Sequence, residues 1–112
     1  MAEKCLFWIP SYRHHQWQPA VDVYRLPHGW LVKCDLAGVR REDIQVSLAD
    51  RRLTICGARR DGLIEKGYHV YSLEIAYSWF ERTVELPCEL EGAELRLDYR
   101  DGMLLISLAT DR

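Results

Sequence analysis

Histidine and cysteine side chains near the start of the sequence are the first residues whose types could bind a metal ion. His14 and His15 follow Cys5 a short way along the chain. Adjacent histidines, however, lack the spacing that makes metal ligands converge on one ion. The cysteines form no C-x-x-C pair, since they stand at Cys5, Cys34, Cys56 and Cys88. We therefore expect no metal site, and we expect the cysteines to be reduced.

Two further patterns bear on nucleotide binding and catalysis. The string GLIEKG at residues 62–67 has the spacing of a phosphate-binding loop, but Tyr68 and His69 follow it where lysine and a hydroxyl residue are required. Cys34 shares a predicted strand face with apolar neighbours, so we expect a buried, inert thiol there rather than a nucleophile. No pair of carboxylates stands out for acid–base catalysis. The sequence predicts no catalytic residue and no cofactor, and it favours a binding module over an enzyme.

The composition limits the class of protein. The chain has 112 residues, 48% of them hydrophobic, and its 15 Lys and Arg against 17 Asp and Glu give a net charge of −2. This indicates one folded domain, and the near-neutral charge argues against a nucleic-acid partner. Three arginine pairs, at 40–41, 51–52 and 59–60, are interpreted as solvated turns with acidic residues close by. The longest apolar run, residues 5–9, is too short for a membrane span or a signal peptide, so we expect a cytoplasmic protein.

Apolar and polar residues alternate with a period of two in short segments, which is typical of half-buried strands. The segments cover residues 21–23, 30–36, 44–48, 53–55, 80–86, 95–99 and 104–108. Turn residues separate them, and those at 49–51 and 100–102 are short enough to close hairpins. No helical stripe of useful length is present. The pattern predicts an all-β fold, an immunoglobulin-like antiparallel β-sandwich of about seven strands.

Residues 1–18 do not follow this pattern and form a predicted N-terminal arm. Its large apolar residues show no clear period and are Leu6, Phe7, Trp8, Ile9, Tyr12 and Trp17. Such a segment cannot form a core alone, so we expect it to make adaptable contacts with other proteins. A disordered arm is the alternative, because chain termini are often poorly ordered.

The second interruption is the connection 60–77, 18 residues long, between two predicted strands. Connections longer than about 12–15 residues are uncommon in compact domains unless they bind something or are disordered. The apolar side chains of this connection are Leu63, Ile64, Tyr68, Val70, Tyr71, Leu73, Ile75 and Tyr77. We expect the loop to bury this surface against its own sandwich or against another chain.

Arg82 is a charged residue on a predicted apolar strand face, which it shares with Phe80 and Leu86. A guanidinium in such a position is expected to be paired, because an unpaired buried charge is costly. Glu65 or Glu74 in the loop could supply the partner. Alternatively, the stem of Arg82 packs on the apolar face while its head reaches solvent.

Several short strings, in their order and spacing, resemble the α-crystallin domain of the small heat shock protein family. VDVY at 21–24 is similar to the opening strand of that domain, and DLAGV at 35–39 with REDI at 41–44 is similar to its D-L-P-G-V…E-D-I stretch. The other matching strings are LTICG at 53–57, FERTVELP at 80–87 and DYRDGML at 98–104. The resemblance covers residues 19–109 and leaves the arm and a very short end, residues 110–112, outside it.

The resemblance implies an ATP-independent chaperone, a holdase that binds partly unfolded client proteins under stress and suppresses their aggregation. It also implies a homodimer of bacterial type, in which a strand within the loop is exchanged between subunits. We place that strand at residues 68–72. The residues assigned to this dimer loop are Tyr68, Val70, Tyr71, Leu73, Glu74, Ile75 and Arg82.

In the same family, a tail with the pattern isoleucine-x-isoleucine or isoleucine-x-valine docks into a groove on a neighbouring subunit. The corresponding groove here is expected to be lined by Ile44, Val46, Leu48, Leu95 and Leu97. Leu97 stands where the family usually has alanine, so it can partly fill the groove, and Ala37 replaces the usual proline. The sequence stops at Arg112 without such a tail. We therefore expect no tail-mediated assembly by this chain alone, and a tail-bearing small heat shock protein is a candidate partner.

Three alternatives follow from these residues. Phe7 and Ile9 point the same way in an extended strand, so the arm could fill the groove of its own or a neighbouring subunit. A protein of another class, an adaptor resembling the co-chaperone CS domain, would share the sandwich but bind one folded partner. A subunit of mixed small heat shock protein assemblies would receive the tail of its partner in its own groove.

Overall fold

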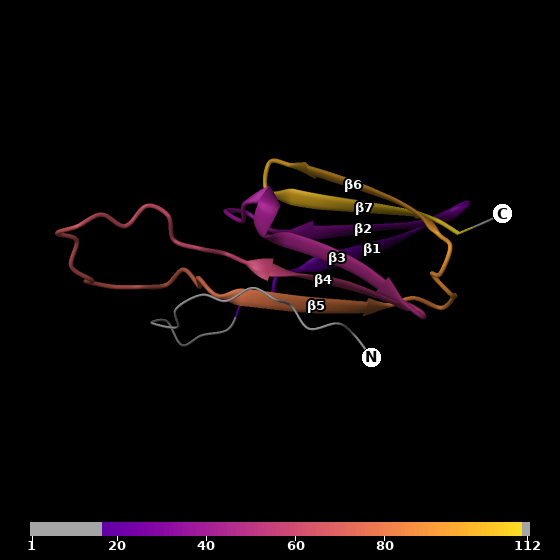
Figure 1. The fold of residues 1–112 in the computed structure, drawn as a ribbon, viewed down its shortest axis with the longest axis horizontal. Helices are drawn as coiled ribbons and strands as arrows, with labels where there is room; N and C mark the ends of the chain where they lie inside the picture. The colour runs from indigo at the N-terminus through magenta and orange to yellow at the C-terminus, as the bar shows by residue number, and fades with distance from the viewer. Residues whose placement is uncertain (1–16, 111–112) are drawn as a thin grey trace.

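The computed structural model describes residues 17–110, which form seven strands and one short 3-10 helix (Figure 1). The strands are β1 (Val21–Leu26), β2 (Gly29–Asp35), β3 (Ile44–Ala49), β4 (Arg52–Ala58), β5 (Trp79–Glu85), β6 (Glu94–Arg100) and β7 (Met103–Ala109), and the helix η1 is Arg41–Asp43. Each segment of alternating residues lies in one of these strands, so the predicted all-β fold is confirmed. Within residues 17–110, no helix is long and apolar enough to cross a membrane.

The strands pair into two antiparallel sheets of unequal size. One sheet has four strands in the order β1-β2-β7-β6, and the other has three in the order β3-β4-β5. Short turns join β1 to β2, β3 to β4 and β6 to β7, as the turn residues predicted, whereas β4 and β5 pair across the long loop. Asp50 and Asp101 in two of these turns adopt positive φ angles of 57° and 54°, which aspartate tolerates better than most residues.

The core lies between the sheets and is filled by alternate residues of their central strands. The fully buried side chains include Val32, Cys34 and Leu36 from the β2 segment, Leu53 and Ile55 from β4, Phe80 from β5, and Ile106 from β7. Burial raises the pKa of the Cys34 thiol to about 12, so the thiol stays protonated at neutral pH. Cys34 is therefore the inert core thiol that the sequence predicted. Among the described residues, Cys34, Cys56 and Cys88 form no disulfide.

Gly57 marks the closest approach between β4 and the start of β3. A Cβ atom at this position would collide with the carbonyl oxygen of Asp43 and lie 3.0 Å from the ring of Phe80. Neither group can move aside easily, because the Asp43 carbonyl is part of the backbone at the end of η1 and the Phe80 ring is fully buried. The glycine of the LTICG string is thus required by packing rather than by its φ angle.

We expect Gly57→Ala to destabilise the fold by about 1–3 kcal/mol, the usual cost of overpacking a filled core. Gly62→Ala is the matched control, since among the described residues its added methyl group would meet only the flexible guanidinium of Arg40, at 3.1 Å. Urea denaturation followed by circular dichroism measures both. Equal unfolding free energies for the two variants would contradict the argument.

Candidate docking surfaces

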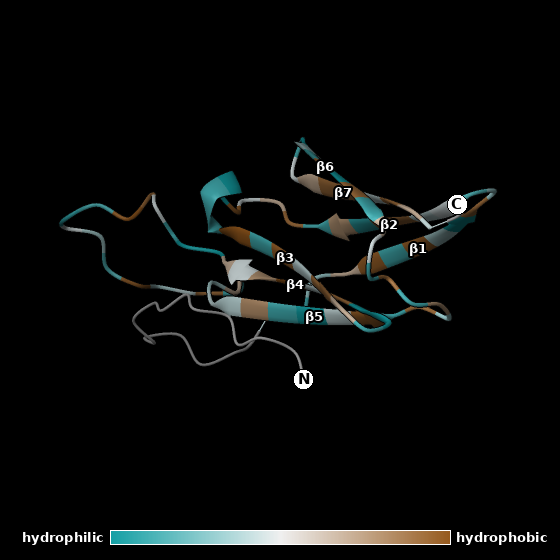
Figure 2. Cartoon of the chain, turned by 45° about the vertical axis from the view of Figure 1, so that its right-hand side comes forward, coloured by the Kyte–Doolittle hydropathy of each residue, from teal (hydrophilic) through white to brown (hydrophobic). Residues whose placement is uncertain are grey.

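The loop between β4 and β5 extends away from the sandwich (Figure 1). Most of its apolar side chains are exposed. Within residues 68–72, Val70 is 76% exposed and Tyr71 is fully exposed. Figure 2 shows apolar, brown stretches on both limbs of the loop. The sequence left open whether the loop packs on its own sandwich or on another chain. Within the described residues, Ala76 and Tyr77 at the base of the loop contact Arg59, whereas Leu63, Val70 and Tyr71 stay exposed rather than packing on the sandwich.

The predicted exchange strand, residues 68–72, makes no strand pairing within the described chain. A shallow apolar hollow lies between the limbs of the loop, lined by Asp61, Ile64, Tyr68, His69, Val70, Tyr71, Ser72 and Leu73. Residues 68–72 belong to no strand, and the backbone N–H of Tyr68 donates to the carbonyl of Glu65 within the loop at 3.2 Å. Strand exchange would pair the backbone groups of this segment with another chain. The exchange itself stays a prediction.

Strand β1 is the outermost strand of the four-stranded sheet, so one of its edges is unpaired. It is short and carries exposed apolar side chains, with Val23 and Tyr24 each 43% exposed. The ammonium of Lys33 lies 5.1 Å from the centroid of the Tyr24 ring and the guanidinium carbon of Arg25 lies 5.3 Å from that of Trp30. An extended segment could add to this edge by backbone hydrogen bonds.

Arg82 lies on the inner face of β5, where it pairs across the strands with Ile55. Its Nη1 donates a 2.6 Å hydrogen bond to the carbonyl oxygen of Pro19, and its side chain is half-buried. No ion pair joins Arg82 to Glu65 or Glu74 within the part of the chain that the structure describes. Within one chain, the partner of Arg82 is therefore a backbone carbonyl, and a carboxylate from a second subunit stays a prediction.

The five predicted groove residues all lie on inner faces of edge strands. Ile44, Val46 and Leu48 of β3 pair with Gly57, Ile55 and Leu53, and Leu95 and Leu97 of β6 pair with Leu108 and Ile106. These partners line or adjoin the core, so both rows point between the sheets. The β3 row is half-buried, but Leu97 remains 51% exposed because no strand of the smaller sheet covers it.

Hydrogen bonds fix β6 beside β3 at both ends of these rows. At one end, the backbone N–H of Leu90, just before β6, donates to the carbonyl of Asp50, just after β3. At the other end, Nη2 of Arg41 donates to the carbonyl of Tyr99. The Tyr99 hydroxyl oxygen lies 2.8 Å from the carbonyl oxygen of Leu36 and 2.6 Å from that of Val39. The structure therefore brings the five predicted residues to one open side of the sandwich, between two unpaired strand edges.

Trp17 is the only predicted arm residue within the described range, and its packing differs from that of a free arm. Its ring meets Phe80 edge-on, with centroids 5.2 Å apart, and its backbone N–H donates to Oγ of Ser78 at 3.2 Å. It is half-buried against the core, which differs from the free arm that the sequence predicted, and its contact with client proteins stays a prediction. Leu6, Phe7, Trp8, Ile9 and Tyr12 lie outside the described residues.

The interpretation of the arginine pair at residues 59–60 as a solvated turn was wrong, because both guanidinium groups have protein partners. Nε of Arg60 lies 3.1 Å from Oδ2 of the buried Asp43. Nε and Nη2 of Arg59 donate to the carbonyl of Ala76 at 2.9 and 2.7 Å. The buried partner of Arg60, Asp43, is distant in sequence and is not the neighbouring acidic residue, Asp61. Sequence spacing gave no signal for the carbonyl partners of Arg59, since every residue has a carbonyl group.

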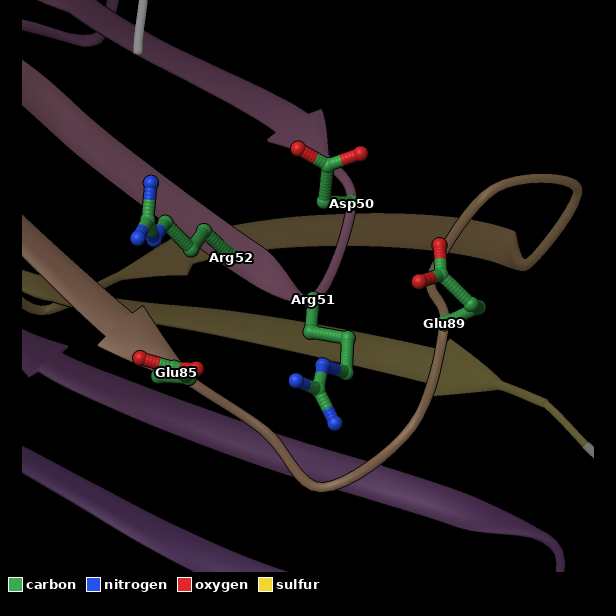
Figure 3. Close-up of a pocket in the computed structure, with 5 residues that line it drawn as sticks. All are labelled: Asp50, Arg51, Arg52, Glu85 and Glu89. Carbon is green, nitrogen blue, oxygen red and sulfur yellow. The ribbon is translucent and has the colours of Figure 1, made fainter. Parts of the chain in front are cut away.

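A small charged hollow lies where β4 begins and β5 ends, and Figure 3 shows its lining. Asp50, Arg51, Arg52, Glu85 and Glu89 surround it. Acidic and basic side chains alternate there, so the hollow does not present one sign of charge to a ligand. Within residues 17–110, no three His, Cys, Asp or Glu side chains are grouped to hold a metal ion.

Known proteins are similar to this chain in sequence and in fold. Spore protein SP21 of Stigmatella aurantiaca is 31% identical over 90 residues, which are 80% of this chain and 53% of that protein. The solved structure of heat shock protein 16.0 from Schizosaccharomyces pombe matches with a TM-score of 0.75 at 26% identity, over 85% of this chain and 88% of that chain. That of hspA from Xanthomonas axonopodis matches with a TM-score of 0.70 at 25% identity, over 86% and 96%.

The chain spans about half the length of the curated relatives it matches. A profile of the Hsp20/alpha crystallin family matches residues 22–112, which include nearly all of β1 and every later strand. The two-sheet sandwich, the projecting loop and the sequence strings agree with this match. The chain belongs to the Hsp20/alpha crystallin family.

Proposed function

We propose that this protein is an ATP-independent, cytoplasmic holdase that works as a homodimer and binds partly unfolded proteins. The observation that carries the proposal is the projecting loop, whose apolar side chains Leu63, Val70 and Tyr71 are each at least 76% exposed. Contiguous apolar surface of this kind is uncommon on monomeric proteins and marks interaction sites. Its family supports a chaperone role and a non-enzymatic one.

The dimer forms when the loop of each subunit adds a strand to the unpaired edge of β1 in the other. Residues 68–72 supply the backbone donors and acceptors, and the apolar side chains of this segment become buried. Arg82 stands close to the start of β1, because its guanidinium bonds to Pro19. Glu74 of the partner subunit is the carboxylate that we expect to reach it.

The groove between β3 and β6 is the second docking surface, and its occupant is the tail of another small heat shock protein. A strand with apolar residues at two alternate positions would place both of their side chains against Leu97 and against the inward-facing residues of β3. The unpaired strand edges on either side offer backbone hydrogen bonds to such a strand.

Light scattering of a heat-aggregating client protein tests the chaperone role. We expect this protein, without ATP, to suppress the scattering at close to stoichiometric ratios, because apolar surfaces bind the client without a driven cycle. A folded immunoglobulin-type domain of similar size is the control. No suppression by folded, dimeric protein would contradict a holdase and favour an adaptor that binds one folded partner.

Sedimentation velocity tests the exchange strand. Val70→Asp puts a charge into the proposed strand pairing, so we expect it to shift the protein from dimer to monomer. Leu63→Asp is the matched control, because Leu63 is 83% exposed on the same loop but lies outside residues 68–72. A dimer that survives Val70→Asp, or that Leu63→Asp disrupts equally, would contradict exchange through residues 68–72.

Binding of a short peptide with the isoleucine-x-isoleucine pattern tests the groove. We expect Leu97→Glu to weaken binding by about tenfold or more, since a carboxylate would face the apolar residues of the peptide. Arg96→Glu, on the outer face of the same strand, should leave the affinity within about twofold. Fluorescence anisotropy of a labelled peptide measures both, and equal effects of the two variants would exclude this groove.

A further inference from the structure

Arg59 occupies the point where the pairing of β4 and β5 ends and the loop begins. Its backbone N–H donates to the carbonyl of Ser78 at 2.9 Å, immediately beyond the last strand pair, Ala58 with Trp79. Residues 60–77 belong to no strand, so the paired strands end at this point. The direction in which the loop leaves the sandwich therefore depends on side chains at this point.

The guanidinium of Arg59 joins three separate segments. Two of its N–H groups donate to the carbonyl of Ala76, on the returning limb of the loop. Nη1 donates to the carbonyl of Ala37 at 3.2 Å, in the connection between β2 and η1. Its central carbon lies 3.6 Å from the centroid of the Trp17 ring, which is stacking distance. The ring of Tyr77 lies on the same cation, with its centroid 5.7 Å away.

Trp17 is fixed independently of Arg59. Its ring packs edge-on against Phe80 and its backbone N–H bonds to Ser78, so it forms a rigid surface for the guanidinium. Pro19, two residues later, is buried and accepts the hydrogen bond of Arg82. The segment leading into β1 and the root of the loop thus share one cluster of contacts, which we call the Arg59 cluster: Trp17, Ala37, Arg59, Ala76 and Tyr77.

We propose that Arg59 is a positioning residue that sets the direction of the projecting loop and couples it to the N-terminal segment at Trp17. A lysine cannot replace it, because a single ammonium cannot donate to two carbonyls in fixed directions while lying flat on an indole ring. This inference rests on the proposed dimer, since the loop must leave the sandwich in one direction to reach β1 of a partner.

Hydrogen exchange and sedimentation together test the Arg59 cluster. For Arg59→Lys we expect amide exchange at the loop base, at residues 59 and 76–78, to increase several-fold, while exchange in β2 and β7 stays unchanged. We expect the dimer dissociation constant to rise by about tenfold, the loss typical of one charge-assisted hydrogen bond. Arg52→Lys is the matched control, because Arg52 is an exposed arginine at the opposite end of β4.

A double-mutant cycle with Trp17→Leu tests the coupling. If Trp17 acts through Arg59, the two substitutions together should weaken the dimer by clearly less than the product of their separate effects. Trp79→Leu serves as the control for losing a partly exposed indole. Effects that simply multiply would overturn the coupling, and exchange that rises uniformly in β2 and β7 would reduce Arg59 to a residue of general stability.

The loop-base exchange rates separate this inference from the proposed dimer. If the wild-type protein is a monomer, the dimer proposal fails, yet Arg59→Lys must still accelerate exchange at residues 59 and 76–78. If the wild-type protein is a dimer and Arg59→Lys changes neither the exchange nor the dissociation constant, the positioning role of Arg59 is excluded while the dimer stands.

Discussion

The unequal size of the two sheets determines where this sandwich has surfaces to offer. Three strands cannot cover the inner face of four, so one row of apolar side chains always extends beyond the covering sheet. On the β6 side that row is left open, and Leu97 is half-exposed. On the β5 side the segment around Trp17 and Pro19 fills the gap, so the sandwich closes there. The groove is thus a consequence of strand number, whichever residues line it.

Features that depend on the period of two were predictable from the sequence. Alternation located all the strands, placed Cys34 in the core, and put Leu95 and Leu97 on the same face, because side-chain direction in a strand follows directly from position. The length of the loop and its apolar residues likewise indicated a segment without a place in the core. These inferences needed only local geometry and the separation of polar from apolar residues.

Contacts made by backbone carbonyls could not be predicted in this way. A carboxylate partner or a solvent-exposed head was expected for Arg82, but within the chain it bonds to Pro19, whose carbonyl is brought there by the path of the segment before β1. Arg59 bonds to Ala37 and Ala76 for the same reason. A carbonyl group has no residue-type signature, so only the tertiary path shows which one a guanidinium meets. The packing of Trp17 on Phe80 could not be predicted either, because the two residues are distant in sequence.

Tyr99 closes one end of the groove with a hydroxyl group that faces two carbonyl oxygens but carries a single proton. Burial raises the pKa of this hydroxyl above its ordinary value. Because the folded-state pKa lies above the unfolded one, the hydroxyl contributes its stabilisation below the unfolded pKa near 10 and loses it as the pH rises through the folded value. An ionised oxygen would repel both carbonyls. Raising the pH through the folded-state pKa should therefore break the contacts of the β6 hydroxyl with Leu36 and Val39, so the closure of this end of the groove depends on one proton.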